Sequence, residues 1–262
     1  MIYKNIFLKK KELNNILNIY RKSINNVGVN NLYYPFIFDS GNKLQKTIGI
    51  WNISLYLKKF KRGAHMSRIF FFLEKYKNIP LNIKLFLKIY KILMYKLESN
   101  DINIQVTFIY FIKKISPISK NISLMNYKLS FFFKRINIQN IFFLKIIIPV
   151  INLCPCSKNI SYYNAHNQRS KVYVYLNIYK NININKTINY IENESSSEIW
   201  SLLKRNDEKY ITEFSYNNPK FVEDIIRNIL LKIKNNNLKS FLIKVENYES
   251  IHNHNVYSLI KY

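Results

Sequence analysis

The sequence predicts an α+β protein, in which antiparallel strands and helices occupy separate segments of the chain. Three observations lead to this prediction. β-branched and aromatic residues alternate with polar residues in a series of short runs, which is typical of strands. Apolar residues recur three and four positions apart in other segments, which is typical of helices. The order strand, strand, helix, helix, strand, strand occurs twice, although the residues themselves do not repeat.

The first half of the chain contains the first set of elements. We expect strands at 24–38 and 46–57, helices near 66–77 and 81–98, and strands at 102–112 and 122–133. The turn-like sequence SGNKLQ separates the first two strands, and Pro80 stands at a plausible helix start.

The second half contains the second set. We expect strands at 141–153 and 171–179, helices at 188–205 and 219–234, and strands at 240–248 and 255–262. Pro219 and two acidic residues lie near the start of the last helix, where both are favourable. The predicted organisation is two tandem ββααββ modules, each a four-stranded antiparallel sheet with two helices. The first module covers 1–135 with a basic N-terminal arm, and the second covers 136–262.

The chain of 262 residues carries a formal net charge of +26, which invites a nucleic-acid interpretation. A compositional explanation is stronger. Lys, Asn, Ile, Tyr and Phe all have A/T-rich codons, and the lysines are spread over the whole chain, so we expect an A/T-rich genome and no nucleic-acid partner. No segment has the pattern of a secretory signal or a membrane span. Cys154 and Cys156 are too close in sequence to form a good disulfide, which favours a reducing cytoplasm.

Histidine and cysteine occur only in three short segments, 63–68, 154–169 and 249–255. These are the residue types that bind transition metals and transfer protons near neutral pH. Each also has an ordinary interpretation, because a cysteine is often a small buried apolar residue and a histidine is often a surface imidazole. A single C-x-C is a weak zinc signal and disfavours a closed zinc finger. The residue types alone leave a metal-dependent enzyme as one alternative.

Several long motifs resemble one family. CPCSKNISYYNAHNQRS looks like the signature of GTP cyclohydrolase type IB, and VGVNNLYYPFIF, KRGAHMSR, LLKRNDEKYITEFSYNNPKFVEDIIR and VENYESIHNHNVYSLI resemble further blocks of that family in the same order. Agreement is weak across 75–135. The resemblance implies two tunnelling-fold modules per chain. It also implies a homo-oligomer, a tetramer in the family, with active sites between subunits and sheet edges covered by neighbours.

The activity implied is the conversion of GTP and water to 7,8-dihydroneopterin triphosphate and formate, the first step of folate biosynthesis. The resemblance assigns Cys154, Glu208 and His252 as ligands of a divalent metal, Zn²⁺ or Mn²⁺ with Fe²⁺ as a further option. Such a metal lowers the pKa of water toward about 7. Cys156 matches a family cysteine that is not a ligand.

The same resemblance assigns roles toward the substrate. Cys154 and His166 would be catalytic, with His166 transferring protons to and from the purine. Glu223 would accept two hydrogen bonds from the guanine edge, although a first-turn helix charge worth about 0.3–1 kcal/mol is the ordinary alternative. The candidates for the triphosphate are His65, Arg68, Lys158 and Arg169. For Lys158 a solvated basic face is an almost equal alternative.

One position departs from the family pattern, because Asn164 stands where the family usually has glycine. Asn tolerates a left-handed backbone better than most residues, so the turn can survive. Two other functions stay open at this point. One is a related tunnelling-fold enzyme, such as the nitrile reductase of queuosine synthesis, whose nicotinamide signature is not visible here. The other is a basic RNA-binding protein in which the motifs are inert.

Overall fold

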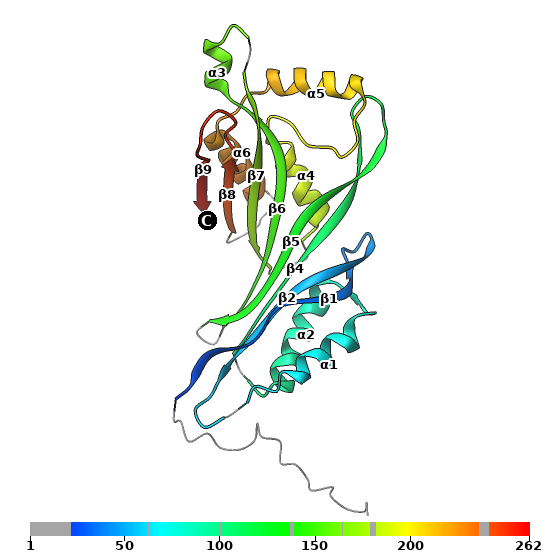
Figure 1. Ribbon diagram of the computed structural model, residues 1–262, viewed down its shortest axis with the longest axis vertical. Coiled ribbons are helices and arrows are strands. Elements are labelled where there is room, and N and C mark those ends of the chain that lie inside the picture. Colours follow the sequence, from blue (N-terminus) through cyan, green and yellow to red (C-terminus); the bar gives the residue numbers. More distant parts are fainter. Residues whose placement is uncertain are drawn as a thin grey trace, which may run out of the picture. The chain divides into compact units, whose positions relative to one another are not determined.

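The computed structural model describes residues 22–61, 63–99, 101–136, 139–163, 165–178, 182–235 and 241–262. The predicted N-terminal arm lies almost entirely outside these residues. The strands are β1 (Ile24–Asp39), β2 (Leu44–Leu57), β3 (Pro80–Leu81), β4 (Ile102–Ile115), β5 (Ile122–Ile136), β6 (Gln139–Leu153), β7 (Asn167–Asn177), β8 (Phe241–Asn247) and β9 (Val256–Lys261). The helices are α1 (Ser67–Tyr76), α2 (Ile83–Lys96), α3 (Pro155–Ile160), α4 (Ile184–Glu192), α5 (Arg205–Asn217) and α6 (Val222–Asn235). The expected α+β class is confirmed (Figure 1).

The chain divides into two compact units. The first consists of the described residues up to Val106 together with Phe132–Ile141, and the second consists of Thr107–Phe131 and Phe142–Tyr262. The strands β4, β5 and β6 therefore contribute residues to both units. Among the described residues, hydrogen-bonded neighbours follow the single order β3-β1-β2-β4-β5-β6-β7-β8-β9. This single order does not confirm the predicted division into two four-stranded sheets.

Aromatic packing holds the first unit together. The strands β1 and β2 are antiparallel, and their buried rings Phe36 and Trp51 both contact Phe86 of α2. The helices α1 and α2 confirm the expected pair. Pro80 was predicted at a helix start but lies in β3, and α2 begins after Asn82, whose side chain accepts a hydrogen bond from the Leu85 amide at 2.9 Å.

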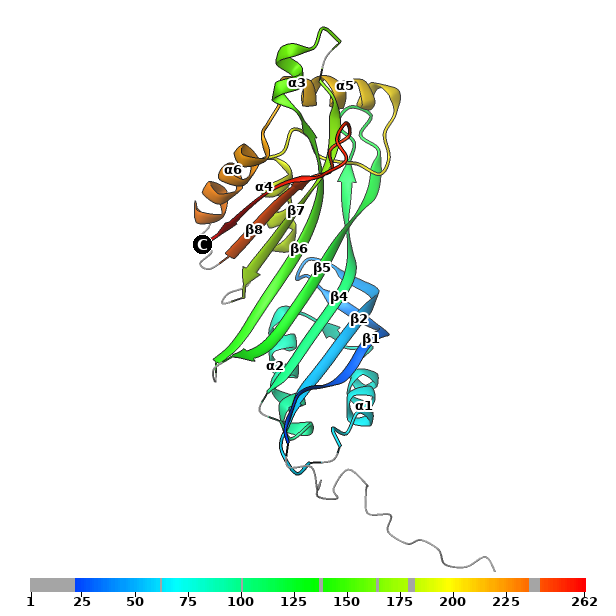
Figure 2. The same ribbon diagram turned by 60° about the vertical axis from the view of Figure 1, so that its left-hand side comes forward.

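Alternating β-branched residues build the core of the second unit. The strands β6, β7, β8 and β9 pair antiparallel in sequence order, and Ile146, Val174 and Ile243 are completely buried. The helix α6 packs on β8 and β9 through residues three, four and seven apart, Val222, Ile225, Ile226 and Ile229. The helix α4 lies beside α6 (Figures 1 and 2).

The predicted helix at 188–205 is wrong after Glu192. The helix α4 ends at Glu192, and the following serines pair with β6 instead of continuing the helix. Ser197 forms an isolated bridge with Ile151, and the Ser196 hydroxyl accepts a hydrogen bond from the Leu153 amide at 3.1 Å. Because short hydroxyl side chains can satisfy backbone groups, a serine run competes with a helix. The helices α3 and α5 were not predicted. No helix in the described ranges is long and apolar enough to cross a bilayer.

Candidate active site

The cysteines lie where β6 ends. Cys154 occupies the N-cap position of α3 in an extended conformation, and Pro155 starts the helix. Its side chain is half-buried and makes no capping hydrogen bond, whereas Cys156 is exposed. The thiol predicted to be a ligand is therefore the more sheltered of the two free cysteines.

The sheet register brings His166 close to the cysteine. Leu153 and Asn167 are paired across β6 and β7, so Cys154 and His166 each lie one residue beyond the same pair. The Nδ1 atom of His166 is 2.8 Å from the Ser250 hydroxyl. Ser250 belongs to the connection between β8 and β9, which also carries His252. Two of the segments named by the sequence are thus joined by a direct side-chain contact.

Further hydrogen bonds fix this connection along the start of β7. The Gln168 amide donates to Glu249 at 2.9 Å, and the Ser170 hydroxyl donates to Asn247 at 2.7 Å. Gln168 is buried, and its Oε1 atom has no hydrogen-bond partner among the described residues. No sequence motif predicted these supporting residues. The pattern that could have indicated them is the set of polar residues at the start of β7 and the end of β8, two strands that are otherwise apolar.

His252 and His254 are both exposed, and their rings stack at a centroid distance of 5.1 Å with an interplanar angle of 20°. His254 had no assigned role in the sequence analysis. The contact makes it the aromatic neighbour of the predicted ligand.

The first turn of α5 contains two adjacent carboxylates in opposite environments. Asp207 is completely buried, whereas Glu208 is exposed and its carboxylate makes no ion pair with another described residue. Burial alone would raise the pKa of Asp207, but hydrogen bonds from Ser119, Lys204 and Ile118 hold that pKa well below its usual range. Glu208 is the member of the pair available to a ligand.

The three segments with predicted metal ligands lie at the same end of the second unit. The helices α3 and α5 and the β8–β9 connection are together there in both views (Figures 1 and 2). Lys158 of α3 donates to the Tyr216 carbonyl near the end of α5 at 2.6 Å, and its ammonium lies 4.2 Å from the centre of the Tyr216 ring. Within the described ranges, however, no three His, Cys, Asp or Glu side chains are close enough to hold a metal ion.

The remaining candidates in this unit are exposed. Glu223 lies in the first turn of α6, beside Asp224, whose carboxylate accepts a hydrogen bond from the Phe221 amide at 3.1 Å. The Glu223 side chain itself is exposed. Arg169 is exposed on β7, and its carbonyl accepts a hydrogen bond from the Tyr248 amide at 2.9 Å.

His65 and Arg68 belong to the first unit. His65 is buried with a φ of 52°, a left-handed conformation that is uncommon for residues other than glycine. The Arg68 guanidinium donates to the Lys96 carbonyl at 2.8 Å and to Glu98 at 3.1 Å. The structure thus gives Arg68 an internal role, and a phosphate would have to compete with Glu98 for it.

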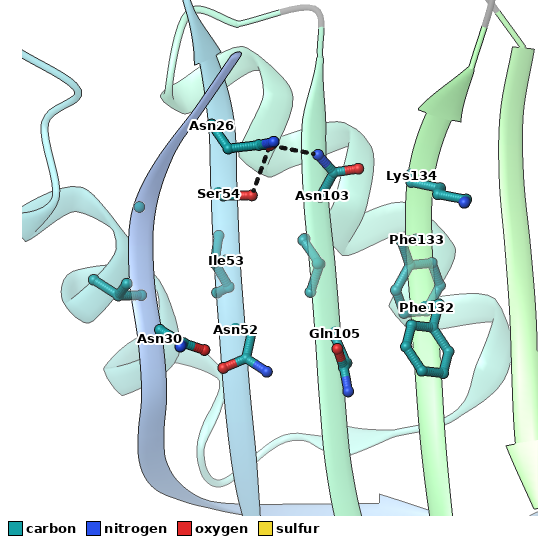
Figure 3. Close-up of a pocket in the computed structure, with 13 residues that line it drawn as sticks. Asn26, Asn30, Asn52, Ile53, Ser54, Asn103, Gln105, Phe132, Phe133 and Lys134 are labelled. Atoms are coloured by element: carbon teal, nitrogen blue, oxygen red, sulfur yellow. Dashed lines mark hydrogen bonds between the residues drawn. The ribbon is translucent and has the colours of Figure 1, made fainter. Parts of the chain in front are cut away.

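Two hollows in the first unit are separate from the cysteine segment. A cavity of about 340 Å³ lies on β1, β2, β4 and β5, where Asn26 accepts hydrogen bonds from Ser54 at 3.3 Å and Asn103 at 3.2 Å (Figure 3). None of the predicted site residues lines it. A groove of about 610 Å³ between α1 and α2 includes Arg68.

Comparisons with known proteins identify the family of the chain. The chain belongs to the type I GTP cyclohydrolase family, because the family model described as type I GTP cyclohydrolase FolE2 matches residues 11–258. Similar curated proteins carry the same FolE2 name. GTP cyclohydrolase FolE2 of Burkholderia multivorans is 39% identical over 240 residues, which cover 91% of this chain and 89% of the relative. FolE2 of Burkholderia ambifaria is 39% identical over 241 residues, and FolE2 of Paraburkholderia xenovorans is 38% identical over 240, with the same coverage.

The resemblance seen in the motifs is therefore confirmed at the level of the family. The match also extends through the weakly matching middle of the chain, 75–135. The roles of the individual site residues stay predictions.

Proposed function

We propose that this chain is a GTP cyclohydrolase that converts GTP and water to 7,8-dihydroneopterin triphosphate and formate, the first step of folate biosynthesis. The observation that carries the proposal is the placement of Cys154 and His166 beyond one strand pair, with His166 bonded to the segment of His252. The family match supports it over nearly the whole chain. We place the enzyme in the cytoplasm of a cell with an A/T-rich genome. We also propose that 1–135 and 136–262 are tandem tunnelling-fold modules.

The metal ligands we propose are Cys154, Glu208 and His252. A thiolate, a carboxylate and an imidazole suit Zn²⁺, and Mn²⁺ or Fe²⁺ are alternatives. These three residues can accept a metal ion because the Cys154 thiol is only half-buried and the Glu208 and His252 side chains are exposed. When bound, the ion would lower the pKa of a water molecule and supply hydroxide. Since one chain's described residues do not bring three donors together, we propose that the site is completed in a homotetramer, at an interface between subunits.

His166 is the residue we propose for proton transfer. Its Nδ1 atom is held by Ser250, so its other ring nitrogen is the one that would exchange protons with the purine. Glu223 would accept two hydrogen bonds from the guanine ring N–H and amine, a pattern that adenine cannot match. Arg169 and Lys158 would neutralise the triphosphate together with His65 and Arg68 of a neighbouring subunit. Lys158 and Arg68 would first have to leave Tyr216 and Glu98.

The central experiment measures formate release from GTP by the purified chain. We expect turnover to stop after chelation and to return with Zn²⁺ or Mn²⁺. The substitution Cys154→Ala should abolish turnover while size-exclusion chromatography shows an unchanged oligomer. The matched control is Cys156→Ala, which should keep most of the activity. Turnover that survives a strong chelator, or a fully active Cys154→Ala variant, would exclude this site. Salt-dependent RNA binding without turnover would favour the RNA-binding alternative.

A further inference from the structure

The first turn of α5 is attached to the connection between β4 and β5, residues 116–121. Asp207 makes the attachment, and it is completely buried. Its Oδ1 atom accepts the backbone amides of Ile118 and Ser119, both at 2.8 Å. Its Oδ2 atom accepts the Ser119 hydroxyl at 2.5 Å and the Lys204 amide at 2.9 Å. Each carboxylate oxygen thus accepts two hydrogen bonds. Charge-assisted hydrogen bonds of this kind are among the strongest in proteins.

The β4–β5 connection is itself well ordered by hydrogen bonds. The Ser116 hydroxyl lies 2.8 Å from the Ser119 hydroxyl and accepts the Asn121 amide at 2.8 Å. The Asn121 side chain also donates to Ser119 at 2.9 Å. These bonds hold Ser119, which supplies two of the donors to the Asp207 carboxylate.

The segment that leads into α5 is attached to the same two strands. The Trp200 indole donates to the Ile115 carbonyl of β4 at 3.0 Å, and the Ser201 hydroxyl donates to the Leu124 carbonyl of β5 at 2.7 Å. The chain is therefore fixed both before α5 and in its first turn.

These contacts determine which way Glu208 faces. Successive residues on an α-helix are separated by about 100° around its axis. Because Asp207 is anchored inward, α5 cannot rotate about its axis without breaking the three hydrogen bonds from Ile118 and Ser119, and Glu208 is held on the exposed side. Residues that do not touch a metal but orient its ligands contribute to metal affinity.

We propose that Asp207, together with Ser119, is a positioning residue that holds the Glu208 carboxylate in the orientation needed to bind the metal. This inference rests on the proposed function, since it takes Glu208 to be a ligand. Asp207 would not touch the metal or the substrate, and it acts only through the first turn of α5.

The test measures Zn²⁺ affinity by competition with a chelating dye, with no GTP present. We expect Asp207→Asn to weaken Zn²⁺ binding by about tenfold or more, the range found for residues that orient metal ligands. The matched control is Asp224→Asn. Asp224 also accepts an amide at the start of its helix but is not connected to the β4–β5 connection, and this variant should bind Zn²⁺ within about twofold of the wild type. Equal losses in the two variants would overturn the proposal.

A milder variant keeps the proposal testable if Asp207→Asn does not fold. Ser119→Ala removes one hydroxyl donor and should weaken Zn²⁺ binding by about threefold, with a smaller fall in melting temperature in the absence of metal than Asp207→Asn causes. Wild-type affinity in Ser119→Ala and Asp207→Asn would overturn the proposal. So would wild-type affinity in Glu208→Gln, because Glu208 would then not be a ligand. If the wild type binds Zn²⁺ in this Asp207-dependent way but does not convert GTP, the proposed function fails and the positioning role stands.

Discussion

The ammonium of Lys114 lies 3.0 Å from the carboxylate of Glu192 in the interior of the second unit, where the two side chains are only 9% and 2% exposed. Lys114 also contacts Glu198 at 2.7 Å, and the Tyr127 hydroxyl donates to Glu192 at 2.8 Å. Burial raises the pKa of Glu192, and the positive charge of Lys114 opposes that rise. The end of α4 is thus tied to β4 and β5 by a buried ionic group.

Breaking this pair should strongly destabilise the protein. We expect Lys114→Met to lower the free energy of unfolding by about 3–5 kcal/mol, because Glu192 would be left buried without its cation. Urea unfolding followed by circular dichroism measures the change. The control is Lys209→Met, which removes an exposed pair with Glu213 at 3.9 Å and should change stability by less than about 0.5 kcal/mol. Similar changes in the free energy of unfolding for both variants would mean that the buried pair contributes little to stability.

The Glu98 carboxylate should make stability depend on pH in the acid range. Hydrogen bonds from Lys61 and Arg68 lower the pKa of Glu98 from 4.5 to about 2. A folded-state pKa below the unfolded value means that the stabilisation is present above pH 4.5 and is lost as the pH falls toward 2. Glu98 is 54% exposed, so the effect should be small. We expect the melting temperature of Glu98→Gln to fall less steeply than that of the wild type between pH 5 and 2. Parallel curves would contradict this.

Gly28 is required by the close approach of β1 to β2. A Cβ atom there would lie 2.0 Å from the Ile53 carbonyl oxygen and 2.6 Å from the Ser54 Cα. We expect Gly28→Ala to destabilise the protein by about 1–3 kcal/mol, since backbone atoms must move apart. The control is Gly41→Asn, at a turn where φ is 87° and an added Cβ atom would meet no atom within 4 Å. This substitution should cost less than about 1 kcal/mol. Thermal unfolding of both variants measures the difference.

The hydrogen bond between Ser250 and His166 should affect catalysis more than binding. We expect His166→Ala to lower kcat by a factor of about 10² to 10⁴, the usual contribution of a general acid or base. Ser250→Ala leaves the imidazole in place but loosens its orientation, so kcat should fall by about three- to tenfold with an unchanged KM for GTP. A wild-type kcat in Ser250→Ala would show that the contact has no role in the reaction.

Removing the charge of Glu223 should weaken recognition of guanine. Loss of charge-assisted hydrogen bonds costs about 1.5–3 kcal/mol, so kcat/KM for GTP should fall by about 10- to 100-fold in Glu223→Gln. Steady-state kinetics measure the change. Glu213→Gln changes an exposed carboxylate on α5 and should leave kcat/KM unaltered. If the two variants behave alike, Glu223 is only a surface charge of α6.

Local patterns in the sequence predicted most of the fold. Strands such as β6 and helices such as α2 were correctly placed because alternation and helical spacing reflect which side of an element is buried. The helix at 188–205 was wrong after Glu192 because Ser195–Ser197 are buried against β6, a long-range contact that no local pattern reveals. The helix α5 was missed because its buried residues are few, Asp207, Ile211 and Ser215.

The site could be predicted only in part. Rare residue types and the family resemblance drew attention to Cys154, His166 and His252, and the strand register then brought their segments together. Ser119 and Asp207 could not be recognised, because their importance comes from a contact between residues 88 positions apart. Arg68 was assigned to phosphate without knowledge of Glu98, its partner in the structure.

The Leu153–Asn167 pair has a consequence for how this region can vary. The hydrogen bonds between β6 and β7 set the positions of Cys154 and His166, so the segment between them does not have to determine their spacing. Its tip carries Tyr162 and Tyr163 in full contact with solvent. We expect substitutions at Tyr162 and Tyr163 to leave the Leu153–Asn167 pair intact, so this exposed tip is a suitable place for a fluorescent label or an affinity tag.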